Sequence, residues 1–282
     1  QLFLARDRFG VKPLYYTHES DFFTFSSEIK PLLSILGKSA DVNSEKIPFF
    51  VLYGNRLNSI DTYINQVSTL PASHFLIYKE GNTELKRYYD VPVESDQSDN
   101  EIELQSKIVE LLRDSIKLRF RCDVPVGTCL SGGFDSSSIV SLSNTPVQKG
   151  LNTFSAVWKD SDCDESKYID LVNSRFNCIP NKVIPDEENF DSVFSKMSYH
   201  QEIPTEGPGL YPQWFVMEKA MGKVKVLLDG QGGDEVFGGY FLLGSFLRGL
   251  IEDRSILRIL RETGSFVSFL NKQGMHSFTG WL

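Results

Sequence analysis

The spacing of apolar residues changes in character about a third of the way along the 282-residue chain. Up to residue 90, short apolar runs alternate with turn residues, a pattern typical of strands in a small α+β unit. The runs predicted as strands are residues 2–5, 14–17, 22–26, 74–78 and 84–89, with a hairpin turn at 79–82 joining the last two. Residues 27–36 and 44–53 have helical spacing, and Ser44 is predicted to cap the second helix.

Beyond residue 100 the apolar positions follow a different rhythm, after a polar and acidic stretch at 91–100 that is typical of a linker. A long helix is predicted over 101–121, with an apolar face formed by Ile102, Ile108, Leu111, Leu112, Ile116 and Leu118. Further strands are predicted at 126–130, 153–157, 182–184 and 224–228, and further helices at 136–142, 165–176, 190–197 and 213–221. Strands that alternate with helices predict βαβ units and a parallel sheet.

Composition narrows the class of protein. With 41% hydrophobic and 23% charged residues, the chain matches a soluble globular protein of two domains. The net charge is −8 and no dense Lys/Arg run is present, so we expect no nucleic-acid partner. No run of eighteen apolar residues and no signal peptide is found, so we expect neither a transmembrane helix nor secretion.

The four cysteines show no C-x-x-C pair and no clustering with histidine. This spacing favours reduced thiols, with Cys122 and Cys129 expected in the core, and a cytoplasmic location.

The string Ser131-Gly132-Gly133-Phe134-Asp135-Ser136 lies between a predicted strand and a predicted helix. At such a place glycines let a phosphate approach the backbone, and the helix start offers N–H groups. Ser131, Ser136 and Ser137 add hydroxyl donors, so the string predicts an anion-binding loop that needs no lysine. The alternative is a serine-rich helix cap without a ligand.

A second glycine-rich stretch, residues 229–240, follows another apolar strand and carries Asp229, Asp234 and Glu235. Carboxylates at such a turn are suited to Mg²⁺, which also keeps water and phosphate ligands. An acidic surface turn is the alternative.

Three strings resemble known families. S-G-G-x-D-S resembles the pyrophosphate loop of the N-type ATP pyrophosphatases, and D-G-Q-G-G-D-E-x-F-G-G-Y at 229–240 resembles the asparagine synthetase signature. Residues 5–16 and 25–30 look like the closing half of a class II glutamine amidotransferase domain. The implied fold is an α+β, Ntn-hydrolase-like amidotransferase remnant at 1–90, a linker at 91–100, and an α/β parallel-sheet ATP-pyrophosphatase domain at 101–282, similar to the adenine nucleotide alpha hydrolases.

The resemblance implies a ligase of the glutamine-hydrolysing asparagine synthase type, which converts aspartate, ATP and ammonia to asparagine through an aspartyl-adenylate. Asp135, Asp234 and Glu235 would act in catalysis, with Asp135 and Asp234 on Mg²⁺. The nucleotide would be held by Leu130, Ser131, Gly132, Gly133, Asp135, Ser136, Val157, Asp229 and Gly230, where Leu130 and Val157 contact adenine through backbone groups. Gln231 and Glu202 are expected near the substrate, and the general base stays open between Glu235 and Glu202.

The chain departs from the family pattern at its start, because no cysteine precedes Cys122 to serve as the glutaminase nucleophile. The chain also begins in an apolar, strand-like run without an initiator Met and ends just after a helical pattern, so we expect a fragment truncated at both ends. Glutamine-derived ammonia is then expected only in the full-length protein. Two other functions stay open: an amide ligase for another carboxylate, such as a β-lactam synthetase-like or a peptide- or sugar-modifying enzyme, and a nucleotide-binding fragment without turnover. As the assembly we expect a homodimer.

Overall fold

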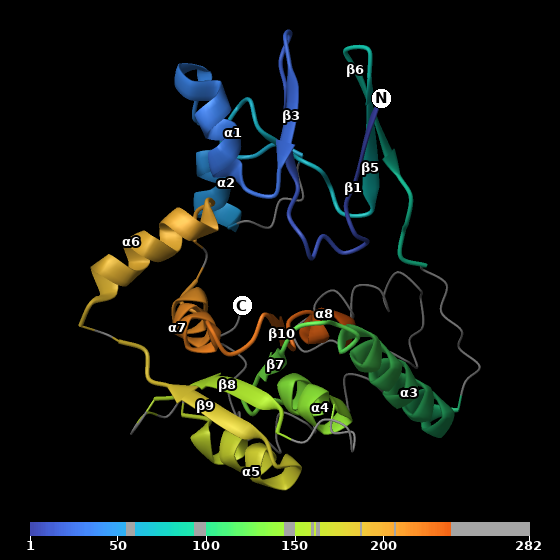
Figure 1. The fold of residues 1–282 in the computed structure, drawn as a ribbon, viewed down its shortest axis with the longest axis vertical. Helices are drawn as coiled ribbons and strands as arrows, with labels where there is room; N and C mark the ends of the chain where they lie inside the picture. The colour runs from blue at the N-terminus through green and yellow to red at the C-terminus, as the bar shows by residue number, and fades with distance from the viewer. Residues whose placement is uncertain are drawn as a thin grey trace, which may run out of the picture.

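The computed structural model describes residues 1–54, 60–92, 100–143, 150–158, 161, 164–186, 188–205 and 207–237. Most of the predicted linker, Cys163 and residues 238–282, with Gly238–Tyr240 of the second glycine-rich stretch, lie outside the described residues. Figure 1 shows an amino-terminal part (residues 1–92) above a carboxyl-terminal part (residues 100–237), with α6 between them. Within the described ranges, no helix is long and apolar enough to cross a membrane.

The amino-terminal part contains two antiparallel sheets, the helices α1 and α2 and the short helix η1. One sheet has the strand order β1-β5-β6 and the other the order β3-β2-β4. The elements are β1 (Leu2–Ala5), β2 (Tyr15–His18), β3 (Phe23–Ser26), α1 (Ile29–Leu36), η1 (Gly37–Ser39), α2 (Lys46–Tyr53), β4 (Ser68–Thr69), β5 (His74–Lys79) and β6 (Asn82–Arg87). Lys79 pairs with Asn82, so the predicted hairpin closes through Glu80 and Gly81, both at positive φ.

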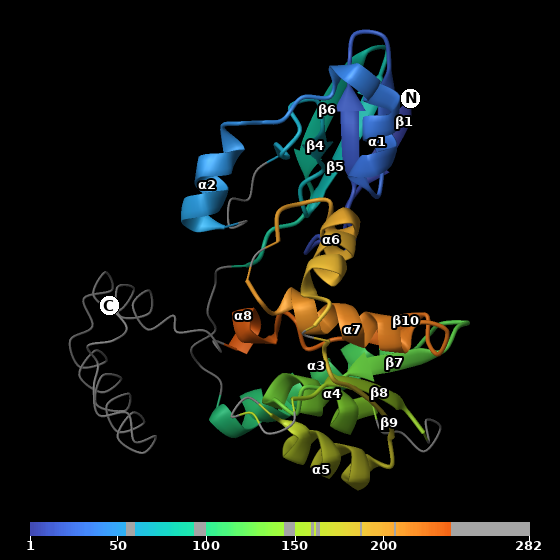
Figure 2. The same cartoon turned by 90° about the vertical axis from the view of Figure 1, so that its left-hand side faces the viewer.

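Alternation along β2 separates two cores in this part. Tyr15 packs against the cluster of Ile29, Leu32, Leu36 and Val67 under α1. Its neighbour Tyr16 packs against the cluster of Leu4, Leu70 and Leu76 between the sheets. Helix, sheet and sheet therefore form three successive layers, which follow one another from left to right in Figure 1, whereas Figure 2 looks onto them from the side of α1.

The carboxyl-terminal part is built on a parallel sheet with the strand order β10-β7-β8-β9. Its elements are α3 (Glu101–Arg119), β7 (Val126–Cys129), α4 (Phe134–Ser143), β8 (Asn152–Ala156), α5 (Ser166–Phe176), β9 (Ile179–Val183), α6 (Phe190–Gln201), α7 (Leu210–Ala220), β10 (Val226–Leu228) and α8 (Gly233–Phe237). One face packs on α4 and α5 through Leu130, Val140, Val157 and Ile169. The other face packs on α7 through Phe154, Val216, Ala220 and Val224.

The predicted strands and helices after residue 100 are therefore confirmed as elements, and the differences lie in their ends and burial. Strand β9 begins three residues before the predicted start, because its backbone pairs with β8 from Asn152 onward. Of the predicted apolar face of α3, only Ile116 is buried, while Ile102 and Leu111 are exposed.

Two smaller predictions are wrong. Ser44 does not cap α2, because the helix begins at Lys46 and the residue before it, Glu45, makes no side-chain cap hydrogen bond. Cys122 is exposed rather than in the core, because it lies in the turn between α3 and β7.

Candidate functional site

The two glycine-rich loops meet at the carboxyl ends of neighbouring strands. Thr128 Oγ1 of β7 donates a hydrogen bond to the carbonyl oxygen of Leu228 in β10 at 3.1 Å, in a buried position. The first loop begins at Ser131, two residues after the end of β7, and the second begins at Asp229, directly after β10. Strand β8, the next strand along the chain, pairs with one edge of β7, and β10 pairs with the other edge. The two loops therefore lie at a topological switch point of the sheet. Open α/β sheets bind their ligands at such points.

The first loop, Ser131–Ser136, is closed by its own hydroxyl groups. Ser136 Oγ accepts a hydrogen bond from the Ser131 N–H at 3.2 Å and lies 3.1 Å from Ser131 Oγ. The Gly133 N–H donates to Ser131 Oγ at 3.3 Å. These bonds are long, so an anion could replace them with shorter, charge-assisted ones.

Gly132 has φ +87°, in the region that favours glycine, and a Cβ there would lie 2.8 Å from the Cβ of Tyr168 in α5. The loop therefore rests directly on α5 and no larger residue fits.

The first turn of α4 carries donor groups that have no hydrogen-bond partner in the part of the chain that the structure describes. Among the described residues, Ser137 Oγ is buried and makes no hydrogen bond. The first amides of a ten-residue helix also have no acceptor within it. A phosphate placed here would meet hydroxyl and N–H donors at the positive end of the helix.

Glycines let the second loop contact the first. A Cβ on Gly230 would lie 3.1 Å from both Asp135 Cβ and the Ser136 nitrogen. A Cβ on Gly233 would lie 2.5 Å from Asp135 Cγ, so the carboxylate of Asp135 rests against the start of α8. The Gly233 N–H donates to the Gly230 carbonyl oxygen at 3.0 Å, which shapes the turn. The structure therefore brings Asp135 next to the residue that precedes Asp234.

Two carboxylates of this region are available to a metal ion. Asp135 and Asp234 are half-buried, whereas Glu235 is exposed. Across the described residues no group of three or more His, Cys, Asp or Glu side chains could hold a metal. A pair of carboxylates suits Mg²⁺ in an octahedral site, where water and phosphate oxygens supply the other ligands.

Leu130 and Val157 form the floor of the first loop. Both are buried in the cluster under α4 and α5. The Leu130 N–H donates to Phe154 O at 2.9 Å, and the Val157 N–H donates to Val183 O at 2.9 Å. Their N–H groups are therefore used within the sheet.

Sequence reasoning missed two neighbours of the loops. Ser155 Oγ in β8 donates a hydrogen bond to the Leu130 carbonyl oxygen at 2.5 Å. The sequence feature that could have indicated this contact is a hydroxyl residue between Phe154 and Ala156 in a predicted strand. Cys129 is half-buried beside Asp229: burial first, and then the charge and hydrogen bonding of Asp229, raise the pKa of this thiol to about 12. Cys129 therefore stays a protonated donor to Asp229 at neutral pH.

The structure places the expected substrate residues in two different regions. Gln231 follows Asp229, whose carboxylate accepts a hydrogen bond from the Gln231 N–H at 3.1 Å, so Gln231 belongs to the second loop. Glu202 lies elsewhere, after α6, where its carboxylate contacts α1. Burial acts to raise the pKa of Glu202, but hydrogen bonds from the Lys30 side chain and from the Ile29 and Lys30 amides outweigh it and lower the pKa.

Comparison with known proteins identifies two family models along the chain. The model for asparagine synthase matches residues 107–271, and the model for a glutamine amidotransferase domain matches residues 1–89. A putative glutamine-hydrolysing asparagine synthetase 2 of Methanocaldococcus jannaschii is 34% identical over 276 residues, which is 94% of this chain and 52% of that protein. The glutamine-hydrolysing asparagine synthetase 1 of Bacillus subtilis is 33% identical over 85% of this chain and 37% of that protein.

A fungal protein is similar as well. The amidase chyE of Penicillium rubens is 28% identical over 259 residues, covering 85% of this chain and 38% of that protein. The chain thus spans about half the length of the first of these relatives and less of the other two.

Proposed function

The chain belongs to the asparagine synthase family, and from this premise we propose that its carboxyl-terminal part is an ATP-dependent amide ligase that converts aspartate to asparagine. The observation that carries the proposal is the contact of the two loops, in which Asp135 of the first rests against Gly233 of the second. We further propose that the amino-terminal part is the closing portion of an Ntn-hydrolase-like amidotransferase domain, which supplies ammonia from glutamine in the whole protein.

The proposed reaction has two steps. A carboxylate oxygen of aspartate attacks the α-phosphorus of ATP, and the bond to the bridging oxygen breaks, so that pyrophosphate leaves and aspartyl-adenylate forms. Ammonia then attacks the acyl carbon, AMP leaves, and the new nitrogen loses a proton. The loop Ser131–Ser136 would hold the departing pyrophosphate, because its amides and hydroxyls lie at the start of α4.

The other residues have proposed roles around this loop. Asp135 and Asp234 would hold Mg²⁺, which neutralises phosphate charge when bound. Gly230 and Asp229 would lie against the nucleotide, with Leu130 and Val157 beneath adenine. Of the two glutamates considered as general base, we assign the role to Glu235 on α8, because the carboxylate of Glu202 is already committed to donors of α1.

The fold assignment is also a proposal. The order β10-β7-β8-β9 and the loop at the switch point support an adenine nucleotide alpha hydrolase-like sheet. The boundary between the two domains is proposed within residues 91–100, and a homodimer is proposed as the assembly.

Isotope exchange between ATP and pyrophosphate, measured over a panel of carboxylic acids, tests the function. We expect exchange that depends on aspartate and Mg²⁺, and a loss on the order of 100-fold in Asp135→Asn, because the variant lacks one of the two anionic groups that would hold Mg²⁺. Asp170→Asn is the matched control, since Asp170 is an exposed carboxylate of α5 paired with Lys182 at 2.6 Å.

Three results would contradict the proposal in different ways. Unaltered exchange in Asp135→Asn would refute the assignment of the loop. Exchange with another acid but not with aspartate would support a ligase for a different carboxylate, a candidate favoured by the similarity to a protein named as an amidase. Binding of ATP by calorimetry without any exchange would identify a nucleotide-binding fragment without turnover.

A further inference from the structure

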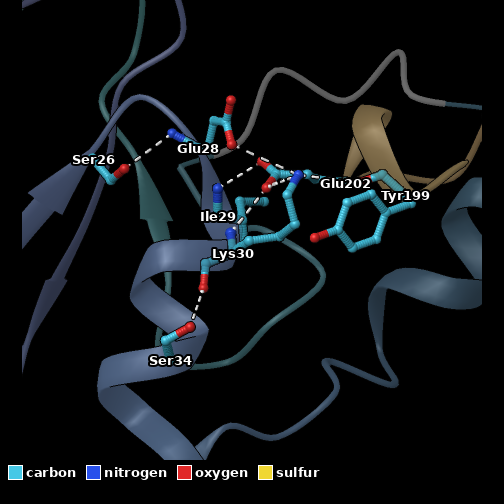
Figure 3. Close-up of polar contacts among 7 residues, drawn as sticks. All are labelled: Ser26, Glu28, Ile29, Lys30, Ser34, Tyr199 and Glu202. Carbon is cyan, nitrogen blue, oxygen red and sulfur yellow. Dashed lines mark hydrogen bonds and ion pairs between the residues drawn. The ribbon is translucent and has the colours of Figure 1, made fainter. Parts of the chain in front are cut away.

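The carboxylate of Glu202 joins the two parts of the molecule (Figure 3). Its Oε2 accepts a hydrogen bond from the Ile29 N–H at 2.6 Å, and its Oε1 accepts one from the Lys30 N–H at 2.9 Å. Oε1 also forms an ion pair with Lys30 Nζ at 2.6 Å, where the side chains of Lys30 and Glu202 are 27% and 7% exposed. Loss of the Lys30 side chain would leave the largely buried carboxylate of Glu202 without its counter-charge, which is costly, whereas Lys30 has a second, longer ion pair with Glu28 at 3.7 Å.

Helix α1 has no cap from its own neighbourhood. Glu28, at the position before the helix, makes no side-chain cap hydrogen bond. The first amides of a helix have no acceptor within it, and the positive end of its dipole favours a negative charge. Glu202 meets both needs from 172 residues further along the chain. The start of α1 therefore depends on a residue of the other part.

Other contacts surround the ion pair. Lys30 Nζ donates to the carbonyl oxygen of Tyr199 at 3.1 Å and lies 4.8 Å from the centre of the Tyr199 ring. Ile203 packs against the cluster of Ile29, Leu32, Leu36 and Val67. The junction thus combines apolar packing with a partly dehydrated charge pair, so it resembles a specific interface rather than a chance surface contact.

The backbone at Glu202 has a conformation that needs support. Its φ of +60° lies in the left-handed region, which L side chains rarely adopt. This turn ends α6 and aims the carboxylate at α1 (Figure 3). The strain indicates that the surrounding contacts hold the residue in place.

The junction is also connected to the nucleotide loops. After α6 the chain continues into α7, whose residues Val216 and Ala220 pack against Phe154 of β8. Helix α7 leads directly into β10 and so to the second loop. Helix α7 therefore connects the segment that follows Glu202 to the strand that precedes Asp229.

We propose that Glu202 and Lys30 form an interdomain clamp that holds the amidotransferase-like part against the ligase part. Glu202 is a positioning residue in this assignment, and it neither binds substrate nor acts as a base. The clamp requires only that the two parts be docked, so it holds whether or not aspartate is the substrate of the carboxyl-terminal part.

Hydrogen–deuterium exchange on the whole chain tests the clamp without any need for activity. We expect Glu202→Ala to raise the exchange rate of the segment containing Ile29 and Lys30 by about 10-fold or more, the range for a lost bond to a charged group. Lys30→Ala should raise it in the same direction and should also raise exchange in the segment around Tyr199. Asp170→Ala, which removes an ion pair of 2.6 Å within one part, is the control and should leave both segments unaltered.

Two further measurements separate the clamp from other roles. Small-angle scattering should show a larger radius of gyration in both clamp variants, while circular dichroism shows retained helix and strand content. ATP–pyrophosphate exchange should persist in Lys30→Ala, because Lys30 lies outside both loops. Unaltered protection of α1 in Glu202→Ala would overturn the proposal, and abolished nucleotide exchange in that variant with α1 still protected would return Glu202 to the substrate site.

The conservative variant Glu202→Gln supplies a readout that a purely structural contact would not change. Wild-type protection of α1 should fall at acid pH as the carboxylate is protonated, whereas the Gln variant should show lower protection that does not vary with pH. The same pH profile in both proteins would refute the role of the charge.

Discussion

Gly233 controls how closely the second loop approaches Asp135. The carboxylate of Asp135 occupies the space that any side chain at position 233 would need, with Cγ and Oδ2 at 2.5 and 2.7 Å from the place of a Cβ. The missing side chain thus lets the carboxylate of Asp135 lie against the residue that precedes Asp234. Gly230 acts in the same way on the Cβ of Asp135.

The variant Gly233→Ala should therefore reduce activity far more than stability. The added methyl group displaces the flexible carboxylate of Asp135, and a shift of about 1 Å at a reacting centre costs on the order of 100-fold. The free energy of unfolding should change by no more than about 1 kcal/mol, since Ala is also the better helix former. ATP–pyrophosphate exchange and urea denaturation measure the two effects.

Gly209→Ala is the control for that variant, because a Cβ at position 209 meets nothing within 4 Å and the residue has φ −64°. Equal losses of activity in both variants would show that the contact with Asp135 has no special role.

Cys129 and Cys122 should differ sharply in reactivity. Burial and the neighbouring Asp229 raise the pKa of Cys129 to about 12, so at pH 8 only about one thiol in ten thousand is ionised. Cys122 is exposed. Iodoacetamide at pH 8 should modify Cys122 at least about tenfold faster than Cys129, as peptide mass spectrometry would measure.

In guanidinium chloride the two cysteines should react at similar rates, because the environment of Cys129 is then lost. Equally fast labelling in the folded protein would show that Asp229 does not lie against this thiol.

At the scale of elements, the starts of helices α4 and α1 differ in how much of their capping could be predicted from the sequence. Helix α4 was predictable, because the serines and glycines that shape its start lie within six residues of one another. Helix α1 was predictable as a helix but not in its cap, since Glu202 is distant in the chain. The family resemblance led us to expect Glu202 near the substrate, because its contact with α1 cannot be read from neighbouring residues.

The start of α1 should respond to pH through the clamp. The pKa of Glu202 is lowered from its ordinary value of 4.5, so its contribution is complete above about 4.5 and is lost as pH falls through the folded value. The hydrogen bond to Glu202 is the main cause that raises the pKa of Lys30 above 10.5, so the contribution of Lys30 is complete below about 10.5 and is lost as pH rises through the folded value. Protection factors of the Ile29 and Lys30 amides should therefore be highest between these limits.

Other ionisable groups lie around the Glu202–Lys30 pair. They are Glu28 and Tyr199 beside Lys30, Tyr15, and His200 against the ring of Tyr199. Comparison with Glu202→Gln isolates the contribution of Glu202. An acid fall that is equally large in Glu202→Gln would point instead to another of these groups.

At the scale of the whole molecule, the order of the parts was predictable and their junction was not. Strands that alternate with helices after residue 100 were enough to predict a parallel sheet, and the strings at 131–136 and 229–240 each follow one of these strands. The apolar residues of α3 led to a predicted buried face, whereas the structure leaves Ile102 and Leu111 exposed. A helical period shows which residues share a face, but it does not show what covers that face.

The strand order β10-β7-β8-β9 also has a consequence in time. Thr128 hydrogen bonds to a strand 100 residues later, so the first loop emerges from the ribosome long before its opposite wall exists. At ordinary rates of synthesis this interval lasts about 5 to 20 seconds. A nascent chain therefore carries an exposed strand edge and an unfinished loop during this interval, and the edge of β7 must avoid pairing with other chains until β10 arrives.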